Sequence, residues 1–533
     1  MGLNSEIGIR LVAVCFSTTK ELSLFAYIAR RLGAMVLILL GSTFLIYLLT
    51  AVSGDPLEDL RFSTEPNAQY LIEQYTKDLQ LDVPAPIRYF LWLEGVLGFL
   101  WGDFTLGIGL DGAPILTAMS LAIPISIRLV ITATILSIII GISIGIITAL
   151  RQYSRFDYSV TFVAFLFYSL PIFWVAVLLK QYGAIGFNDF LEFPTISTEW
   201  IVGLSLASGI FWTGIMGGDK IRLLINFGVS TASTAVVLFF ISSSGWLVEP
   251  ALGPVLITVM AVGVALGVTQ LSTGISNRRV TVISLAMAAL TPVFYFVMQP
   301  VFSSEFDGAL MPLLALAAIG VGILSGVVFG GDDRRAAART AAIVAFLNAG
   351  VIVLDRFMQS WNEYMFDVAF GRPIRTVGDS TLDLDGDYWI TGIDAFTHLL
   401  LPTMALMLIS LAGYVRFSRA SLLEVLNQDY IRTARAKGLN ERTVIMRHAF
   451  RNSLIPLTTI MAFDFAGVLG GAIITEQVFG WRGMGTIFNQ ALQRVDLNGV
   501  MGVVLVTSIS ALVFNLIADL IYSALDPRIR VTK

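Results

Sequence analysis

Six cations are the most distinctive side chains of this chain, because they lie together in one segment, Ser421 to Arg451. Only three acids share the segment, so it carries a net positive charge. An excess of arginine and lysine beside apolar spans is typical of the cytoplasmic side of a membrane. Surface cations also favour docking of a partner of complementary charge. The segment is therefore predicted to lie at the cytoplasmic face of the membrane. The cations are Arg432, Arg435, Lys437, Arg442, Arg447 and Arg451, and the acids are Glu424, Asp429 and Glu441.

The same segment has the sequence features of an ordered loop. Leu422 to Ala436 contains good helix formers and no proline. Gly438 suits the left-handed position that ends a helix, and Asn440 can cap the next one. We therefore expect a helix, a glycine corner and a second short helix within a cytoplasmic loop at positions 421–452.

Motifs for catalysis and nucleotide binding are missing from the sequence. There is no G-x-x-x-x-G-K-[ST] phosphate loop, no H-E-x-x-H and no G-x-S-x-G. Two histidines, His398 and His448, are too few for a histidine-based metal cage. We expect a surface contact for His448 and a neutral interfacial position for His398. The chain is thus predicted to be no enzyme and to have no cofactor or metal.

A few residues inside apolar runs are candidates for helix packing or for a transport pathway. Gly467 and Gly471 form a GxxxG pattern, as do Gly141 and Gly145, and such spacing lets helix backbones approach closely. These glycines could pack helices together either inside the bundle or at an interface with a partner protein. Asp464 lies near the middle of an apolar run, where a carboxyl group must face water or a polar partner. It could therefore anchor the bundle or line a pathway.

Two prolines also interrupt apolar runs. We expect Pro171 and Pro456 each to kink or begin a helix, because proline lacks the backbone N–H that a helix interior uses.

The segment RTARAKGL, followed by RHAFRNSLIP, resembles the coupling loop (the "EAA" loop) of ABC-importer permeases in the dipeptide, oligopeptide and nickel branch. Arg432-Thr433-Ala434 stand where the general motif has Glu-Ala-Ala, and Gly438 holds its glycine. The leading acid is thus replaced by arginine, and His448 to Arg451 replace the usual Ile-x-Leu-Pro ending. The resemblance implies contact with an ATPase subunit through Arg432, Thr433, Ala434, Arg435, Ala436, Lys437, Gly438 and Leu439.

Four other segments are similar to the same family: Leu79–Phe104, the run SLPIFW that contains Pro171, Gly470–Gly485 and Asn515–Arg530. The resemblance covers about Arg30 to Lys180 and Thr397 to Lys533. It leaves out the middle of the chain, roughly Glu199 to Gln359.

Composition places the chain in the membrane without any family. Hydrophobic residues make up 56% of it and charged residues 14%, and about 20 apolar residues suffice to span a bilayer. We predict an all-α polytopic protein with six core spans and about six inserted ones. The core spans are 32–52, 123–150, 158–184, 399–418, 454–475 and 500–524. The inserted spans are 200–216, 223–247, 251–271, 280–302, 309–329 and 340–357.

The short loops give an orientation. With the amino terminus inside, arginines and lysines fall in the inner loops throughout and acids in most of the outer ones. Both termini are then cytoplasmic in a multi-pass protein of the plasma or inner membrane.

The predicted organisation has five parts. Residues 1–30 form a cytoplasmic segment, 31–185 hold core spans one to three, 199–359 are the inserted block, 360–397 form an extracellular loop, and 398–533 hold core spans four to six. The inserted spans have few intramembrane charges and no recognisable motif, which favours a peripheral module over a transport path.

Two extracellular stretches are acidic. Residues 54–119 carry ten acids against three bases and enough apolar residues to form a structured cap. The loop 360–397 contains Asp379, Asp383, Asp385 and Asp387 in a pattern similar to a calcium loop, but the final bidentate glutamate is missing. A solvated acidic loop is the favoured interpretation.

The function that the resemblance implies is a permease subunit of an ATP-driven ABC importer for di- or oligopeptides. Its partners would be a homologous second permease, two ATPase subunits, an extracellular substrate-binding protein and membrane lipid, with no nucleic acid. Nickel, opines or oligosaccharides stay open as substrates. A self-sufficient secondary transporter is the alternative, although such carriers usually have two similar halves. A sensor or enzyme subunit fused to a permease-like core is a weaker one.

Overall fold

The computed structural model describes residues 30–64, 66–302, 305–384 and 387–525. Side chains at positions 462–463, 466–471 and 522–525 lie outside this description, as do the cations expected beyond Leu525. The regular elements within the described ranges are helices, and the only β pairing there is an isolated bridge between Ile108 and Pro114. Helices suit apolar runs of this length, because a helix satisfies its backbone hydrogen bonds internally where lipid offers none.

Ten helices in the described part of the chain are long and apolar enough to cross a membrane, and the count rises to eleven when the bent pair at Pro171 is included. This confirms the predicted all-α polytopic fold. The ten are Arg30–Ala51, α5 (Ile115–Leu150), α9 (Thr198–Met216), α10 (Lys220–Ser244), α11 (Gly253–Ser272), α12 (Arg278–Met298), α13 (Met311–Phe329), α14 (Arg334–Gln359), α16 (Tyr388–Leu426) and α21 (Leu497–Leu525), where the spans of α13 and α14 also include adjoining turns. The remaining expected span lies in α19 (Phe450–Phe479).

The chain divides into two compact units. Unit 1 consists of residues 1–177 and 402–533, and unit 2 of residues 178–401. Unit 2 is thus wider on both sides than the inserted block expected at 199–359. Contacts inside the unit explain the difference, since Asn188 Nδ2 donates to the Ile374 carbonyl at 2.8 Å and Trp389 is fully buried in the unit's aromatic core.

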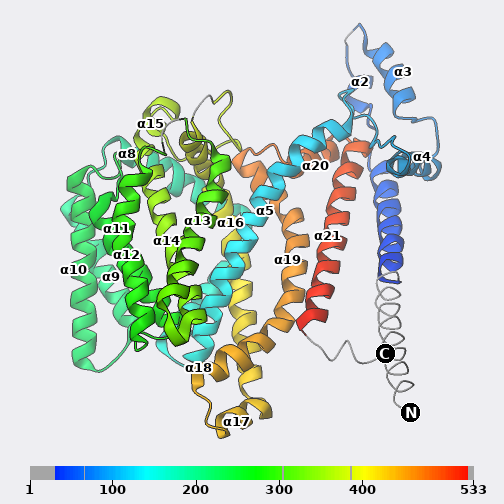
Figure 1. Cartoon of the computed structure of the whole chain (residues 1–533). Coiled ribbons are helices and arrows are strands. Elements are labelled where there is room, and N and C mark those ends of the chain that lie inside the picture. Colours follow the sequence, from blue (N-terminus) through cyan, green and yellow to red (C-terminus); the bar gives the residue numbers. More distant parts are fainter. Residues whose placement is uncertain (1–29, 65, 303–304, 385–386, 526–533) are drawn as a thin grey trace, which may run out of the picture. The chain divides into compact units, whose positions relative to one another are not determined.

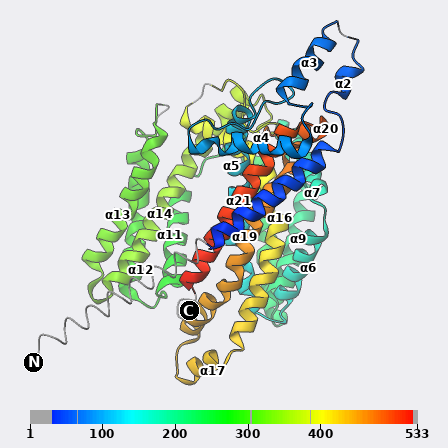
Figure 2. The same ribbon diagram turned by 90° about the vertical axis from the view of Figure 1, so that its right-hand side faces the viewer.

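In unit 1, α19 packs against α5 and α21. The segment after the first span is ordered, as expected for a cap: α2 (Glu58–Arg61), α3 (Ala68–Asp78) and α4 (Ala85–Leu97) follow one another. Tyr89 of α4 contacts the first span through a 2.9 Å hydrogen bond with Thr43. Figure 2 shows α4 and α20 (Met484–Gln493) at one end of this unit and α17 (Asp429–Ala436) at the other.

Unit 2 holds the inserted helices, drawn in green in Figure 1. The helices α9 and α10 form one hairpin, whereas α11 to α14 form a group in which α14 contacts α11, α12 and α13. The core at one end of this group is aromatic: Phe302, Phe306 and Phe357 surround Trp389 with ring centroids 5.0–5.2 Å from it. The inserted helices and the start of α16 therefore share one core.

Three details of the predicted elements need correction. The helix expected over 422–436 is interrupted, because α16 ends at Leu426 and α17 begins at Asp429 after an extended Gln428. The second short helix, α18 (Glu441–Thr443), continues through a π-helical turn (Val444–Ala449) into α19 without a break. Pro456 lies inside α19, so of the kink or helix start that we expected there, the helix start is wrong.

Candidate functional site

The helix α17 is amphipathic, and its apolar side is buried. Ile431 and Ala434 pack with Leu422 of α16, Ala149 of α5 and Val444 of the π turn. The spacing of three residues places Ile431 and Ala434 on one helix face. Packing of this face against the ends of α5 and α16 sets the orientation of the short helix. A displacement of α17 would therefore be transmitted to both α5 and α16.

The corner after α17 has the geometry that the glycine predicts. Gly438 has φ of +75°, the left-handed region, and its N–H donates to the Arg435 carbonyl at 2.9 Å. The Leu439 N–H donates to the Ala434 carbonyl at 3.4 Å, and Asn440 Oδ1 accepts from the Thr443 N–H at 3.1 Å. Both helix ends at the corner are thus capped, as the sequence predicted.

An ion pair spans the corner. Arg435 Nη2 lies 2.6 Å from Glu441 Oε1, and Arg435 Nε donates to Glu441 Oε2 at 3.1 Å. The hydrogen bonds from Arg435 hold the pKa of Glu441 below its ordinary value. Both side chains are exposed, so water screens most of this attraction. The pair nevertheless gives Arg435 a partner within the loop that sequence reasoning did not assign.

Most of the other residues predicted for coupling lie on the exposed face of α17 and of the corner that follows it; together they form the surface around α17. Arg432, Thr433, Ala436, Lys437 and Leu439 are all exposed. Exposed apolar side chains accompany them: Leu439 is 41% exposed, Tyr430 43% and Met446 57%. Of the eight residues predicted for coupling, only Ala434 is buried. The arrangement is a cationic surface with an apolar centre, of the kind that docks a protein partner.

Two residues beside this surface were missed by sequence reasoning. Asp157 lies at the start of α6 (Arg155–Ser169). Its carboxylate accepts two hydrogen bonds from Arg419 of α16, from Nε at 2.7 Å and from Nη2 at 2.8 Å. Its side chain is 3% exposed and also accepts the Tyr153 N–H at 3.0 Å. Arg419 lies near the end of α16, one turn before Leu422 under α17. The bidentate pair thus holds the helix that leads into the surface around α17. Opposite charges in two predicted inner loops were the available sequence signal.

A second missed group lies at the other end of unit 1. Glu476, 1% exposed, accepts Ser126 Oγ at 2.5 Å and the N–H groups of Gly485 and Thr486 at 2.7 and 3.3 Å. Its carboxylate therefore caps the first turn of α20, where a negative charge is favoured. In the segment Gly470–Gly485, which resembles the permease family, this glutamate is thus a structural residue.

The candidates within apolar runs fall in different places. Asp464 in α19 faces α16, where Ser410 Oγ donates to its Oδ1 at 3.4 Å. Gly141 and Gly145 in α5 lie against α16, and a Cβ on either would collide with Tyr414 or Ser418. The glycine seam of α5 is therefore inside unit 1.

The surroundings of Gly467 and Gly471 lie outside the described residues. Pro171 lies at the break between α6 and α7 (Ile172–Leu178), as its backbone chemistry predicts. His398 is buried, with Nδ1 2.8 Å from the Asp394 carbonyl oxygen, whereas we expected an interfacial position; His448 is half-buried in the π turn.

The comparisons with known proteins point in one direction. Residues 281–531 match the family described as "Binding-protein-dependent transport system inner membrane component". The match begins inside the block that the motif-based resemblance had left out.

Individual permeases match shorter stretches. The oligopeptide transport system permease protein OppB of Mycobacterium tuberculosis is 36% identical over 189 residues, 35% of this chain and 56% of that protein. The dipeptide transport system permease protein DppB of Escherichia coli K12 is 46% identical over 149 residues, 28% of this chain and 43% of that protein. The oligopeptide transport system permease protein AppB of Bacillus subtilis is 41% identical over 136 residues, 26% and 43% of the two chains. The chain thus spans about half the length of the curated relatives it matches, and its resemblance to peptide-importer permeases is confirmed.

Proposed function

Because the chain is similar to these permeases, we propose that it is a transmembrane permease subunit of an ATP-driven importer of di- or oligopeptides. The observation that carries the proposal is the surface around α17: a helix braced on α5 and α16, a glycine corner, and exposed Arg432, Lys437 and Leu439. An arrangement of this kind can pass a movement of a docked ATPase to two membrane helices.

The partners follow from the same proposal. A homologous second permease would complete the path, two ATPase subunits would dock beneath, and an extracellular binding protein would deliver substrate to the acidic segment 54–119. The names of the relatives support a peptide as the substrate. The test is uptake of labelled di- and oligopeptides by the reconstituted complex, with nickel and an oligosaccharide as competing substrates. Uptake of nickel or sugar alone would overturn the peptide assignment.

The proposal predicts that ATP use depends on partner subunits. The purified chain in nanodiscs should release no phosphate from ATP above a protein-free blank, because its sequence holds no phosphate-binding loop. Adding the two ATPase subunits should give vanadate-sensitive release. Hydrolysis by the chain alone would contradict the assignment.

Charge at position 435 should set the strength of docking. We expect Arg435→Glu to weaken association with the ATPase subunits about tenfold, roughly 1.4 kcal/mol, because a carboxylate would replace a cation at the rim of the interface. Co-purification and surface plasmon resonance measure the effect. Arg222→Glu, at an exposed cation of unit 2, is the matched control.

The double variant Arg435→Glu/Glu441→Arg separates docking from loop bracing. It can restore an ion pair across the corner while position 435 stays negative. Docking should stay weak if the partner reads the charge at 435. If the double variant associates with the ATPase subunits as strongly as the wild type, Arg435 acts by stabilising the loop itself. If the single variant Arg435→Glu associates as strongly as the wild type, Arg435 does not belong to the interface.

A further inference from the structure

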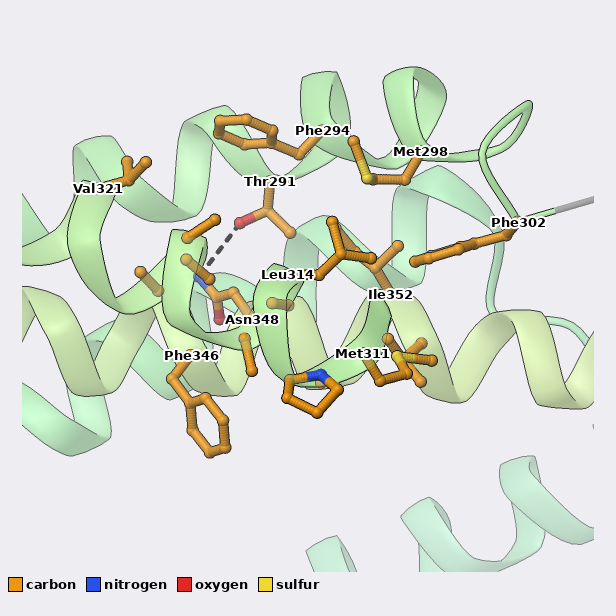
Figure 3. A pocket seen from close by; sticks show the side chains of 18 of the residues that line it. Thr291, Phe294, Met298, Phe302, Met311, Leu314, Val321, Phe346, Asn348 and Ile352 are labelled. Atoms are coloured by element: carbon orange, nitrogen blue, oxygen red, sulfur yellow. Dashed lines mark hydrogen bonds between the residues drawn. The ribbon is translucent and has the colours of Figure 1, made fainter. Parts of the chain in front are cut away.

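A cavity of about 540 Å³ lies among α12, α13 and α14 of unit 2. Most of its lining is hydrocarbon and thioether, as Figure 3 shows with Phe294, Met298, Met311 and Ile352. Its size falls in the range of pockets that hold small organic ligands. All three helices are apolar enough to cross a membrane. The apolar lining therefore suits molecules that dissolve in a bilayer rather than ions or peptides.

One polar side chain distinguishes this cavity from a packing defect. Asn348 is 3% exposed, and its Nδ2 donates to Thr291 Oγ1 at 3.1 Å (Figure 3). The Thr291 hydroxyl donates in turn to the Met287 carbonyl at 3.0 Å. The amide oxygen of Asn348 is buried without a hydrogen-bond partner. Buried acceptors in proteins are almost always satisfied, so this oxygen calls for a donor.

The chemistry of the lining restricts the kind of molecule that can supply this hydrogen-bond donor. A water molecule held in a protein interior usually makes two to four hydrogen bonds, and this lining offers it little beyond Asn348 and Thr291. A charged group would find no opposite charge among the lining residues. A hydroxyl group can donate to the amide oxygen and also accept a hydrogen bond, while an attached hydrocarbon chain would cover the apolar walls.

We propose that this cavity binds an uncharged lipid, a hydrocarbon chain that ends in a hydroxyl group, with the hydroxyl on Asn348. The chain would lie along α13 between Met298 and Val321, against the small side chains Ala318 and Ala349. The inserted helices would then be a lipid-binding module, a role that is independent of the proposed transport function.

The test uses the full chain in nanodiscs and a dodecanol analogue with a photoreactive diazirine on its chain. Peptide mass spectrometry after irradiation should place the label in α12 to α14. Unlabelled dodecanol should suppress this labelling at least tenfold more effectively than dodecane, which has the same chain without the hydroxyl. Equal suppression by the two would overturn the role of Asn348, and labelling spread evenly over all lipid-facing helices would overturn the site.

Variants sharpen the result. Asn348→Leu should abolish the preference for dodecanol over dodecane, whereas Ala318→Phe should remove the labelling by filling the cavity. Leu316→Phe is the matched control, because it adds a ring on the same helix at an exposed position that does not line the cavity. Gel filtration of each variant checks the fold. Unchanged labelling in Ala318→Phe would contradict the proposal, and the comparison of dodecanol with dodecane on the wild-type chain tests it without any variant.

Discussion

Replacing Arg419 with leucine should destabilise unit 1 and abolish uptake. The change would leave Asp157 as a buried carboxylate without its two hydrogen bonds from the guanidinium group. Breaking a buried ion pair from one side costs about 3–5 kcal/mol. We expect the low end, because Arg419 itself is 28% exposed. Differential scanning fluorimetry in nanodiscs and peptide uptake by the complex measure the two effects.

A double variant provides the control for this prediction. Asp157→Leu/Arg419→Leu removes both charges, so it should recover most of the lost stability. If the ion pair serves only to hold α16 in place, peptide uptake by the double variant should recover together with its stability. Wild-type stability in Arg419→Leu would show that the pair contributes nothing.

Replacing Gly438 with valine should stop transport while leaving the chain folded in the membrane. A residue with a Cβ in the left-handed conformation costs roughly 1–2 kcal/mol, and branching at Cβ adds to it. No atom lies within 4 Å of the position that a Cβ would take, so backbone strain is the whole effect. The corner would relax by moving α17, and we expect peptide uptake to fall at least tenfold with unchanged subunit expression.

Two further substitutions isolate the backbone effect. Gly438→Asn should keep most of the uptake, because asparagine tolerates the left-handed conformation. Gly228→Val in α10 introduces the same side chain at a glycine with open space and an ordinary φ, and should be silent. Normal uptake by Gly438→Val would remove the corner from the coupling mechanism.

Local sequence signals predicted much of the fold. Long apolar runs predicted the all-α polytopic fold, with ten candidate spans, or eleven with the bent pair, in the described part of the chain, because a bilayer leaves a long apolar segment little choice of structure. The corner was also predictable, since Gly438 and Asn440 act on their own backbone neighbours. The break at Asn427–Gln428 was not predicted, because the absence of proline favoured a continuous helix although Asn427 and Asp429 have low helix propensity.

The groups that depend on distant partners could not be predicted. Asp157 and Arg419 are far apart in sequence, and so are Ser126 and Glu476. No local pattern distinguishes these buried acids from exposed ones. Asp464 lies beside Ser410 of α16, a neighbour that the sequence does not show.

The burial of Trp389 has a consequence for the order in which unit 2 can fold. Phe302 and Phe306 leave the ribosome well before Trp389, because α13 and α14 are made in between. At roughly 5–20 residues per second, these phenylalanines would wait on the order of ten seconds for the ring that covers them. During synthesis the inserted helices therefore have an incomplete core until the start of α16 arrives.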